Sequence, residues 1–283
     1  MILALTALGK DVTNVDGHNL LSGLTDMAYV RKQGINGPIW ALIAFDSGNY
    51  PVPAGGDVTR QALIQVILDA QLSDGGWALS GSTSDPDMTG MALQALAPYY
   101  NTDADVKNAV DVALIALSEM QQTDGSFSSI DGTNIESIAQ VVTALAALGI
   151  DAEADPRFIK NSHSALDALC AFYVEDGGFR HTLDGKLDGM ATEQGYYALT
   201  AYFRMLDGKT ALYDMTDVID MGGDVTADEP IEETEPAPTE PVDTPAKEGR
   251  SFPWWLVIVI VVLAGAIVVL VIISKPKKGR HTK

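Results

Sequence analysis

The sequence predicts an all-α fold in which outer and inner helical hairpins stack into an incomplete α/α toroid, followed by one C-terminal transmembrane helix. Three observations support this prediction. A segment with an Asp-Gly turn recurs about every 50 residues, which is typical of stacked two-helix units. An amphipathic stretch precedes each turn and a mostly apolar stretch follows it. Beyond the repeats, residues 252–273 form a run of 22 residues without a charge.

The Asp-Gly turns mark three copies of one plan. They read QLSDGGW from Gln71, QQTDGSF from Gln121 and YVEDGGF from Tyr173. The aspartates of successive copies are 50 and 52 residues apart. This even interval predicts three similar units that pack side by side.

The stretches around the turns predict paired helices. Before the second turn, Val106, Val110, Leu114 and Leu117 recur on one helical face. The stretches after the turns are rich in Ala and apolar on most sides, which is typical of interior helices. A closed ring of six such hairpins needs roughly 300 residues, so the roughly 220 available residues leave the ring open. The predicted outer helices span residues 20–33, 60–71, 104–121 and 156–173, and the predicted inner helices span residues 2–8, 36–45, 87–98, 136–148 and 193–206.

The turn residues resemble a known motif. The pattern Gln71-x-x-x-Gly75-x-Trp77 is similar to the QW motif of the prenyltransferase and squalene-cyclase repeat superfamily, and the other copies are near matches. The resemblance covers roughly residues 1–220 and implies the α/α toroid. It leaves function open, because the superfamily includes terpene cyclases, protein prenyltransferase β-subunits, complement thioester domains and the helical domain of cobalamin carriers. The chain also looks like bacterial surface proteins that carry this repeat.

The motif residues are predicted to be structural. Glycine permits a left-handed turn, and Asp and Gln side chains satisfy free backbone groups at helix ends. The aromatic ring of each copy is expected to pack between repeats. The residues concerned are Gln71, Asp74, Gly75, Trp77, Gln121, Asp124, Gly125, Phe127, Asp176, Gly177 and Phe179.

The catalytic motifs of the superfamily's cyclases are incomplete here. A DxDD string raises the pKa of one aspartate through like charges, but Met88 stands where the last carboxylate of Asp85-Pro86-Asp87-Met88 would be. The same residues suit a helix start, with Asp85 as N-cap and Pro86 at the first helical position. A Mg²⁺-binding DDxxD string is absent from the sequence.

The thiol and metal chemistry of the superfamily is also unsupported. Only His163 and Cys170 share a predicted helix, two turns apart, so no zinc site and no other metal site is predicted. Cys170 is the only cysteine and is predicted to be a small buried side chain. Thioester domains carry GCGEQ, whereas residues 190–194 read MATEQ, with Ala191 in place of the thiol.

Ligand binding at the mouth of the ring remains as the candidate function of the repeats. Alignment of the inner helices places Asn36, Asp87, Glu136 and Glu193 at equivalent first-turn positions. The helix dipole also stabilises acidic side chains in the first turn, so a purely structural role is the alternative to ligand binding. Aromatic side chains on the inner helices are expected either to line a pocket or to pack in the core. The complete set of candidate ligand-binding residues is Asn36, Asp87, Glu136, Glu193, Gln194, Trp40, Tyr196 and Tyr197.

The C-terminal region predicts a membrane anchor at the end of a stalk. Residues 224–250 are rich in Glu, Thr and Pro, a composition that favours an extended, disordered segment after the repeat domain of residues 1–223. Residues 252–273 are long enough to cross a bilayer, and the basic residues 274–283 follow directly. This charge bias predicts a single-pass cell-membrane protein with a cytoplasmic C-terminus and most of the chain outside the cell.

An external repeat domain needs a signal peptide, but residues 1–10 read MILALTALGK and resemble the end of an inner helix. We therefore expect the sequence to be part of a longer protein. Tail-anchored insertion of a cytosolic domain is the competing explanation.

Charge argues against nucleic-acid binding. The chain has 18 Lys and Arg against 38 Asp and Glu, and residues 1–223 carry 11 basic and 29 acidic side chains. Such a surface repels phosphate backbones.

Together these patterns favour a membrane-anchored, non-catalytic surface module that binds a small molecule or a surface partner. No cofactor is required by the sequence; capture of a corrinoid is one specific version, implied by the resemblance to cobalamin carriers. Two alternatives stay open. The chain could be a divergent terpenoid cyclase or prenyltransferase-like enzyme, or an adhesion or scaffold protein without a small-molecule pocket.

Overall fold

The computed structural model describes residues 1–129, 132–175 and 177–218. The chain divides into two units, residues 1–224 and 225–283, and only the first is described. The predicted stalk of residues 224–250, transmembrane helix of residues 252–273 and tail of residues 274–283 therefore lie outside the described residues. Asp176 of the third turn also lies outside them. Of the helices that the structure describes, none is long and apolar enough to cross a membrane.

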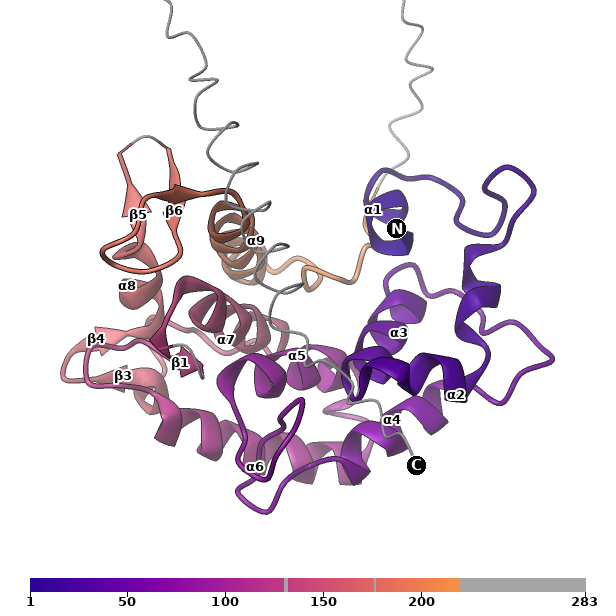
Figure 1. Ribbon diagram of the computed structural model, residues 1–283, viewed down its shortest axis with the longest axis horizontal. Coiled ribbons are helices and arrows are strands. Elements are labelled where there is room, and N and C mark those ends of the chain that lie inside the picture. Colours follow the sequence, from indigo (N-terminus) through magenta and orange to yellow (C-terminus); the bar gives the residue numbers. More distant parts are fainter. Residues whose placement is uncertain (130–131, 176, 219–283) are drawn as a thin grey trace, which may run out of the picture. The chain divides into compact units, whose positions relative to one another are not determined.

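The described chain is mostly helical, as predicted, and its main helices form two rows (Figure 1). Helices α3, α5, α7 and α9 pack against one another in chain order, and α4, α6 and α8 pack against their other side. The inner row is α3 (Asn36–Asp46), α5 (Pro86–Leu96), α7 (Ile135–Ala147) and α9 (Gly189–Leu206), preceded by α1 (Ile2–Ala7). The outer row is α4 (Arg60–Asp69), α6 (Ala104–Met120) and α8 (Ala165–Cys170).

Three inner helices, α5, α7 and α9, start with the same kind of cap. Asp85, Asn134 and Asp188 each accept a hydrogen bond from the backbone N–H three residues later, at 2.8–2.9 Å. This bond satisfies one of the free N–H groups of the first turn. The proposed role of Asp85 as N-cap of α5 is thereby confirmed, and Pro86 occupies the first turn.

Two predicted outer helices are wrong as continuous elements. Residues 156–173 form a 3₁₀ turn (Pro156–Phe158), a hairpin of β3 (Ile159–Lys160) and β4 (His163–Ser164), and only then α8. Asn161 and Ser162 adopt φ values of 46° and 69°, which make the tight turn of the hairpin and stop a helix. The capping box of Ser164 and Asp167 then starts α8.

The expected helix of residues 20–33 is likewise divided. It consists of two 3₁₀ turns, Leu20–Leu24 and Arg31–Gln33, on either side of α2 (Met27–Val30). The Asp26 side chain accepts hydrogen bonds from Ala28 and Tyr29, so it caps a new helix in the middle of the predicted one. Amphipathic spacing alone did not reveal these internal caps.

Short antiparallel strands follow the second turn and lie on both sides of the third turn, and the sequence did not predict them. One hairpin pairs β1 (Ser128–Ser129) with β2 (Gly132–Thr133). The other sheet pairs β5 (Tyr173–Val174), β6 (Gly178–Arg180) and β7 (Leu187–Asp188) in chain order. Strands of two or three residues are too short to show an alternating pattern.

The Asp-Gly turns connect successive repeats through their glutamines. Gln71 donates hydrogen bonds to the carbonyls of Gly75 in its own turn and Ala109 in α6, at 2.7 and 2.8 Å. Gln121 does the same in the second copy, at 3.0 Å to Gly125 and 2.9 Å to Phe158. Each glutamine therefore ties its turn to the next outer element.

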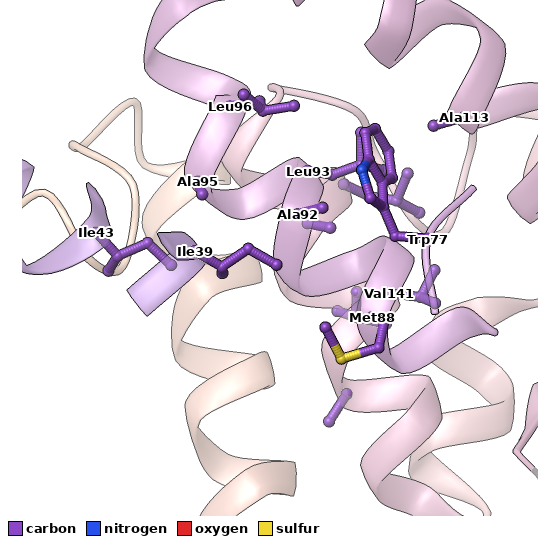
Figure 2. Packing of buried hydrophobic residues seen from close by; sticks show 14 of the residues in the cluster. Ile39, Ile43, Trp77, Met88, Ala92, Leu93, Ala95, Leu96, Ala113 and Val141 are labelled. Carbon is purple, nitrogen blue, oxygen red and sulfur yellow. The ribbon is translucent and has the colours of Figure 1, made fainter. Parts of the chain in front are cut away.

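The aromatic residues of the three turns are buried. Trp77, Phe127 and Phe179 are at most 1% exposed. Figure 2 shows the Trp77 indole in the same buried cluster as Leu93 of α5 and Ala113 of α6. Cys170, by contrast, is exposed at the end of α8, so the prediction that it is buried is wrong.

Candidate functional site

The first turns of α5 and α7 and the second turn of α9 place acidic side chains along the inner row. The predicted first-turn position of Glu193 is wrong, because α9 begins at Gly189, four residues earlier. We call Asp87, Glu136 and Glu193 the acidic rim. Glu136 Oε2 lies 2.7 Å from Nδ1 of His181, which follows β6. Burial raises the pKa of Tyr197 on α9 most, and the charges of Asp87, Glu193 and Glu136 add to the increase.

Asp87 has the most perturbed environment of the rim. Burial raises its pKa, the negative charges of Asp85 and Glu136 add to the increase, and the adjacent Ser137 hydroxyl offsets part of it. Asp87 Oδ1 and Ser137 Oγ are buried and have no well-aligned hydrogen-bond partner in the described part of the chain. Such unpaired polar atoms are uncommon in folded proteins and are often found at functional sites.

Below the rim, three inner helices are joined by an amide ladder, a name we use for Gln94, Gln140, Gln194 and Tyr197. Gln94 Nε2 donates to Gln140 Oε1 at 2.9 Å, and Gln140 Nε2 donates to the Tyr197 hydroxyl at 2.6 Å. That hydroxyl donates to Gln194 Oε1 at 2.9 Å. Burial raises the pKa of Tyr197 well above its ordinary value, so the hydroxyl stays protonated and can donate.

The sequence identified Gln194 and Tyr197 but missed Gln94 and Gln140. Gln94 lies seven residues after Asp87, and Gln140 lies four residues after Glu136. These intervals correspond to whole helical turns and place each glutamine on the same face as the rim residue above it. A search along the inner face of each helix, rather than at its first turn alone, would have found them.

A cavity of about 610 Å³ lies at the other ends of α3, α5 and α7. The segment after α9, residues 208–218, crosses back to the end of α3, and residues 211–214 and 216 line the cavity. In Figure 1 this segment is the orange coil that runs from α9 toward α1. We call residues 208–218 the strap. The volume of the cavity is within the range found for small-molecule sites.

On one wall of this cavity, polar side chains form hydrogen bonds with one another and with backbone carbonyls. Asp46 accepts hydrogen bonds from Arg60 Nε at 2.6 Å and from the Tyr99 hydroxyl at 2.8 Å. Arg60 Nη2 also donates to the carbonyls of Phe45 and Tyr50, both at 2.8 Å. Burial, with the charge of Asp46, raises the pKa of Tyr99 far above its ordinary value. The Arg60 charge is thus balanced within the protein.

The remaining predicted site residues lie elsewhere. Asn36 and Trp40 line a separate hollow of about 490 Å³ against α1 and α2, although the Trp40 ring also meets the strap residue Tyr213 edge to face, with ring centroids 5.5 Å apart. Tyr196 is 44% exposed and donates to the Gly177 carbonyl of the third turn, at 3.1 Å. Tyr196 therefore supports a turn and does not join the rim.

Comparisons with known proteins assign no family. Neither a scan against protein-family models nor a search of curated proteins finds a match to this chain. Within residues 1–129, 132–175 and 177–218, no group of three or more His, Cys, Asp or Glu side chains is arranged to hold a metal ion.

The raised pKa of Asp87 predicts how a substitution changes stability with pH. We expect Asp87→Asn to raise the free energy of unfolding at pH 7 by about 1 kcal/mol, because it removes a buried charge that lacks full pairing. The pKa of Asp87 is higher in the folded state than the ordinary value of 3.8. The charge therefore costs stability above the folded-state pKa, and the cost disappears below about pH 3.8, where both states are protonated.

Urea unfolding of the wild type and the variant between pH 3 and 7 measures this difference. Glu119→Gln is the matched control, because Glu119 is exposed on α6 and its variant also removes one negative charge. A loss of stability in Asp87→Asn at pH 7 would show instead that the ionised carboxylate makes a favourable contact.

Proposed function

We propose that this chain is a non-catalytic binding module whose inner helices, as part of an α/α toroid, present a small molecule or a surface partner with the acidic rim and the amide ladder. The observation that carries the proposal is the convergence of Asp87, Glu136, Gln140 and Tyr197 from α5, α7 and α9. Convergent polar groups with perturbed pKa values are common features of binding sites, and the ladder reaches the cavity of about 610 Å³ through Gln94.

The repeat geometry supports the proposed relation to the prenyltransferase and squalene-cyclase repeat superfamily. Gln71 and Gln121 make equivalent pairs of hydrogen bonds, one within the turn and one to the next outer element. Equivalent contacts in successive copies are expected of a repeat array in which each unit packs only on its neighbours.

The proposed cellular setting is the outer face of a membrane, with residues 252–273 as the single span and residues 224–250 as the stalk. The hydropathy of the span and the basic residues after it support this orientation. The acidic character of residues 1–223 favours a neutral or cationic ligand over an anionic one. A corrinoid is one such ligand to include among those tested.

An enzymatic alternative rests on Asp87 itself. A buried carboxyl group with a raised pKa can hold the proton that a terpenoid cyclase delivers to an alkene. Asp85, the first aspartate of the Asp85-Pro86-Asp87-Met88 string, is the N-cap of α5 and accepts a hydrogen bond from the Met88 N–H. The enzymatic alternative predicts that the wild type converts a polyprenyl substrate and that Asp87→Asn abolishes this turnover. Gas chromatography of the products decides between the enzyme and the binding module.

The binding proposal is tested by a thermal-shift screen of a small-molecule library, corrinoids included, against the intact chain. We expect at least one compound to raise the melting temperature, and its Kd to rise about ten-fold in Glu136→Gln/Glu193→Gln, because the rim would lose two charges. Ten-fold corresponds to about 1.4 kcal/mol of binding free energy.

Glu119→Gln/Glu175→Gln is the control for this screen. It removes the same charge from two exposed positions, one on α6 and one beside β5. Equal affinity of the rim variant, the control and the wild type for a confirmed ligand would rule out the rim as the binding site.

A further inference from the structure

The cavity beneath the strap has the features of a binding site that the sequence did not indicate. Its walls come from the last turns of α3, α5 and α7 and from the strap. Ile43, Ala147 and Leu212 give it an apolar body, whereas Gln94, Thr143 and Tyr213 add polar groups. Small-molecule sites commonly combine a mostly apolar wall with a few polar groups that orient the ligand.

Gln94 is the polar group with unused bonding capacity. Its side chain is 6% exposed, and its amide nitrogen is engaged with Gln140 in the ladder. Its Oε1 has no hydrogen-bond partner among the described residues. A ligand with a hydroxyl or amide donor would satisfy this acceptor after a small side-chain adjustment, and the gain is large because a buried unpaired acceptor is costly.

The charges around the cavity exclude an anion. Arg60 already pairs with Asp46 and with two backbone carbonyls. The other acid of the lining, Asp214, accepts hydrogen bonds from the backbone N–H and the hydroxyl of Thr216. Because the carboxylates outnumber the guanidinium group, the cavity favours an uncharged ligand over a sulfonate or phosphate.

The strap is held unequally at its two sides. Near α9, Arg204 donates to the Thr210 carbonyl and hydroxyl and to Asp217, at 3.1, 2.6 and 2.7 Å. At α3, the attachments are the Met215 N–H bond to the Ser47 carbonyl, at 2.7 Å, and the edge-to-face contact of Tyr213 with Trp40. The α3 side is thus the weaker side, and release there would open the cavity while the strap stays attached to α9.

We propose that the cavity binds an uncharged small molecule with an apolar ring and one hydrogen-bond donor, and that the strap releases from α3 to admit it. This inference rests on the proposed binding function and adds a second small-molecule site at the other end of the inner helices from the acidic rim. The rim and the cavity meet at the amide ladder, since Gln94 belongs to the ladder and lines the cavity.

The test uses the intact chain and two dyes. Anilinonaphthalene is an uncharged dye with one N–H donor, and anilinonaphthalene sulfonate is the same dye with a negative charge. We expect anilinonaphthalene to bind with blue-shifted emission and the sulfonate to bind at least about ten-fold more weakly. Ala147→Phe should abolish anilinonaphthalene binding by filling the cavity, whereas Ala154→Phe, in an exposed loop, should not.

The strap is tested with a reversible lock. Ser47→Cys/Met215→Cys in a Cys170→Ser background joins two residues that a backbone hydrogen bond already brings together. We expect the disulfide to slow anilinonaphthalene association at least about ten-fold and reduction to restore it. Trp40→Leu, which removes the ring contact with Tyr213, should instead speed association.

The outcomes test three claims separately: that the cavity binds a ligand, that the strap controls access to it, and that the acidic rim binds a ligand. Anilinonaphthalene binding that Ala147→Phe leaves unchanged, or absence of anilinonaphthalene binding, overturns the cavity site, while the rim screen stands independently. Equal association rates for the locked, reduced and Trp40→Leu proteins overturn the strap as a gate. Unchanged affinity of Glu136→Gln/Glu193→Gln for a ligand from the rim screen, with anilinonaphthalene binding intact, overturns the rim site alone.

Discussion

Replacement of Trp77 by alanine should be the most damaging single change in the described domain. The indole is completely buried, and its Nε1–H donates to the Ile67 carbonyl at 2.7 Å. Deletion of a buried tryptophan side chain costs roughly 3–5 kcal/mol through lost burial and the cavity left behind. The unpaired Ile67 carbonyl adds to this cost. Urea unfolding followed by circular dichroism should show the loss.

Trp77→Phe is the matched control, because phenylalanine occupies the equivalent position in the other turns, as Phe127 and Phe179. It keeps an aromatic ring in the cluster but removes the N–H donor. We expect a smaller loss of about 1–2 kcal/mol. If Trp77→Ala cost no more than Trp77→Phe, the ring would not be the contact that packs the first turn against α5 and α6.

The second large effect is expected for Gly125→Ala. Gly125 has a φ of 83°, and a Cβ atom there would lie 2.3 Å from the Ser164 carbonyl oxygen. The left-handed conformation costs alanine roughly 1–2 kcal/mol, and the overlap with backbone atoms forces a shift that adds roughly 1–3 kcal/mol. We therefore expect a loss of about 3 kcal/mol, measured as a reduced urea midpoint.

Two other turn glycines separate the conformational cost from the contact cost. At Gly177, φ is 88° but an added Cβ would meet no atom of the described chain within 4 Å, so Gly177→Ala should cost about 1 kcal/mol. At Gly75 the closest atom is a Val112 side-chain carbon at 2.7 Å, which can move more easily. We expect losses in the order Gly125, Gly75, Gly177. Equal losses at the three positions would mean that the approach of the next repeat contributes nothing.

This comparison explains why the turns were readable from sequence. A left-handed glycine, a carbonyl-binding amide and an aromatic ring each meet a requirement within a few residues of the turn, so the pattern QLSDGGW predicts the turn around Gly75 directly. The bounds of α5, α6 and α7 were close to the predicted ranges for a similar reason, since their apolar spacing and caps are local. The predicted toroid, membrane span and orientation remain predictions.

The outer segments of residues 20–33 and 156–173 show where local reasoning fails. Their apolar residues keep a helical spacing, but Asp26 caps a new helix and Asn161 turns a hairpin inside the expected elements. A side chain that competes for backbone N–H groups can override amphipathic spacing. Such competition depends on which conformation the neighbouring repeat will accept.

In the candidate site, the sequence likewise predicted the positions of residues but not their environments. Asp87 and Glu136 were predicted because first-turn positions follow from helix alignment, and both lie in the first turns of their helices. The pKa of Asp87 is raised mainly by burial, with smaller contributions from the charges of Asp85, which is visible in the sequence, and of Glu136, 49 residues away. No spacing rule reports the burial or the approach of Glu136.

The sequence by itself determined the repeat interval, the turn chemistry and the helical character of the inner segments, because each depends on neighbours within one or two helical turns. Only the tertiary structure decided that Met215 meets Ser47, that Gln94 meets Gln140, and that a cavity lies beneath the strap. These contacts join residues separated by 46 or more positions, and they depend on how far each helix is displaced against the next. A displacement of this kind leaves no periodic trace in the order of the residues.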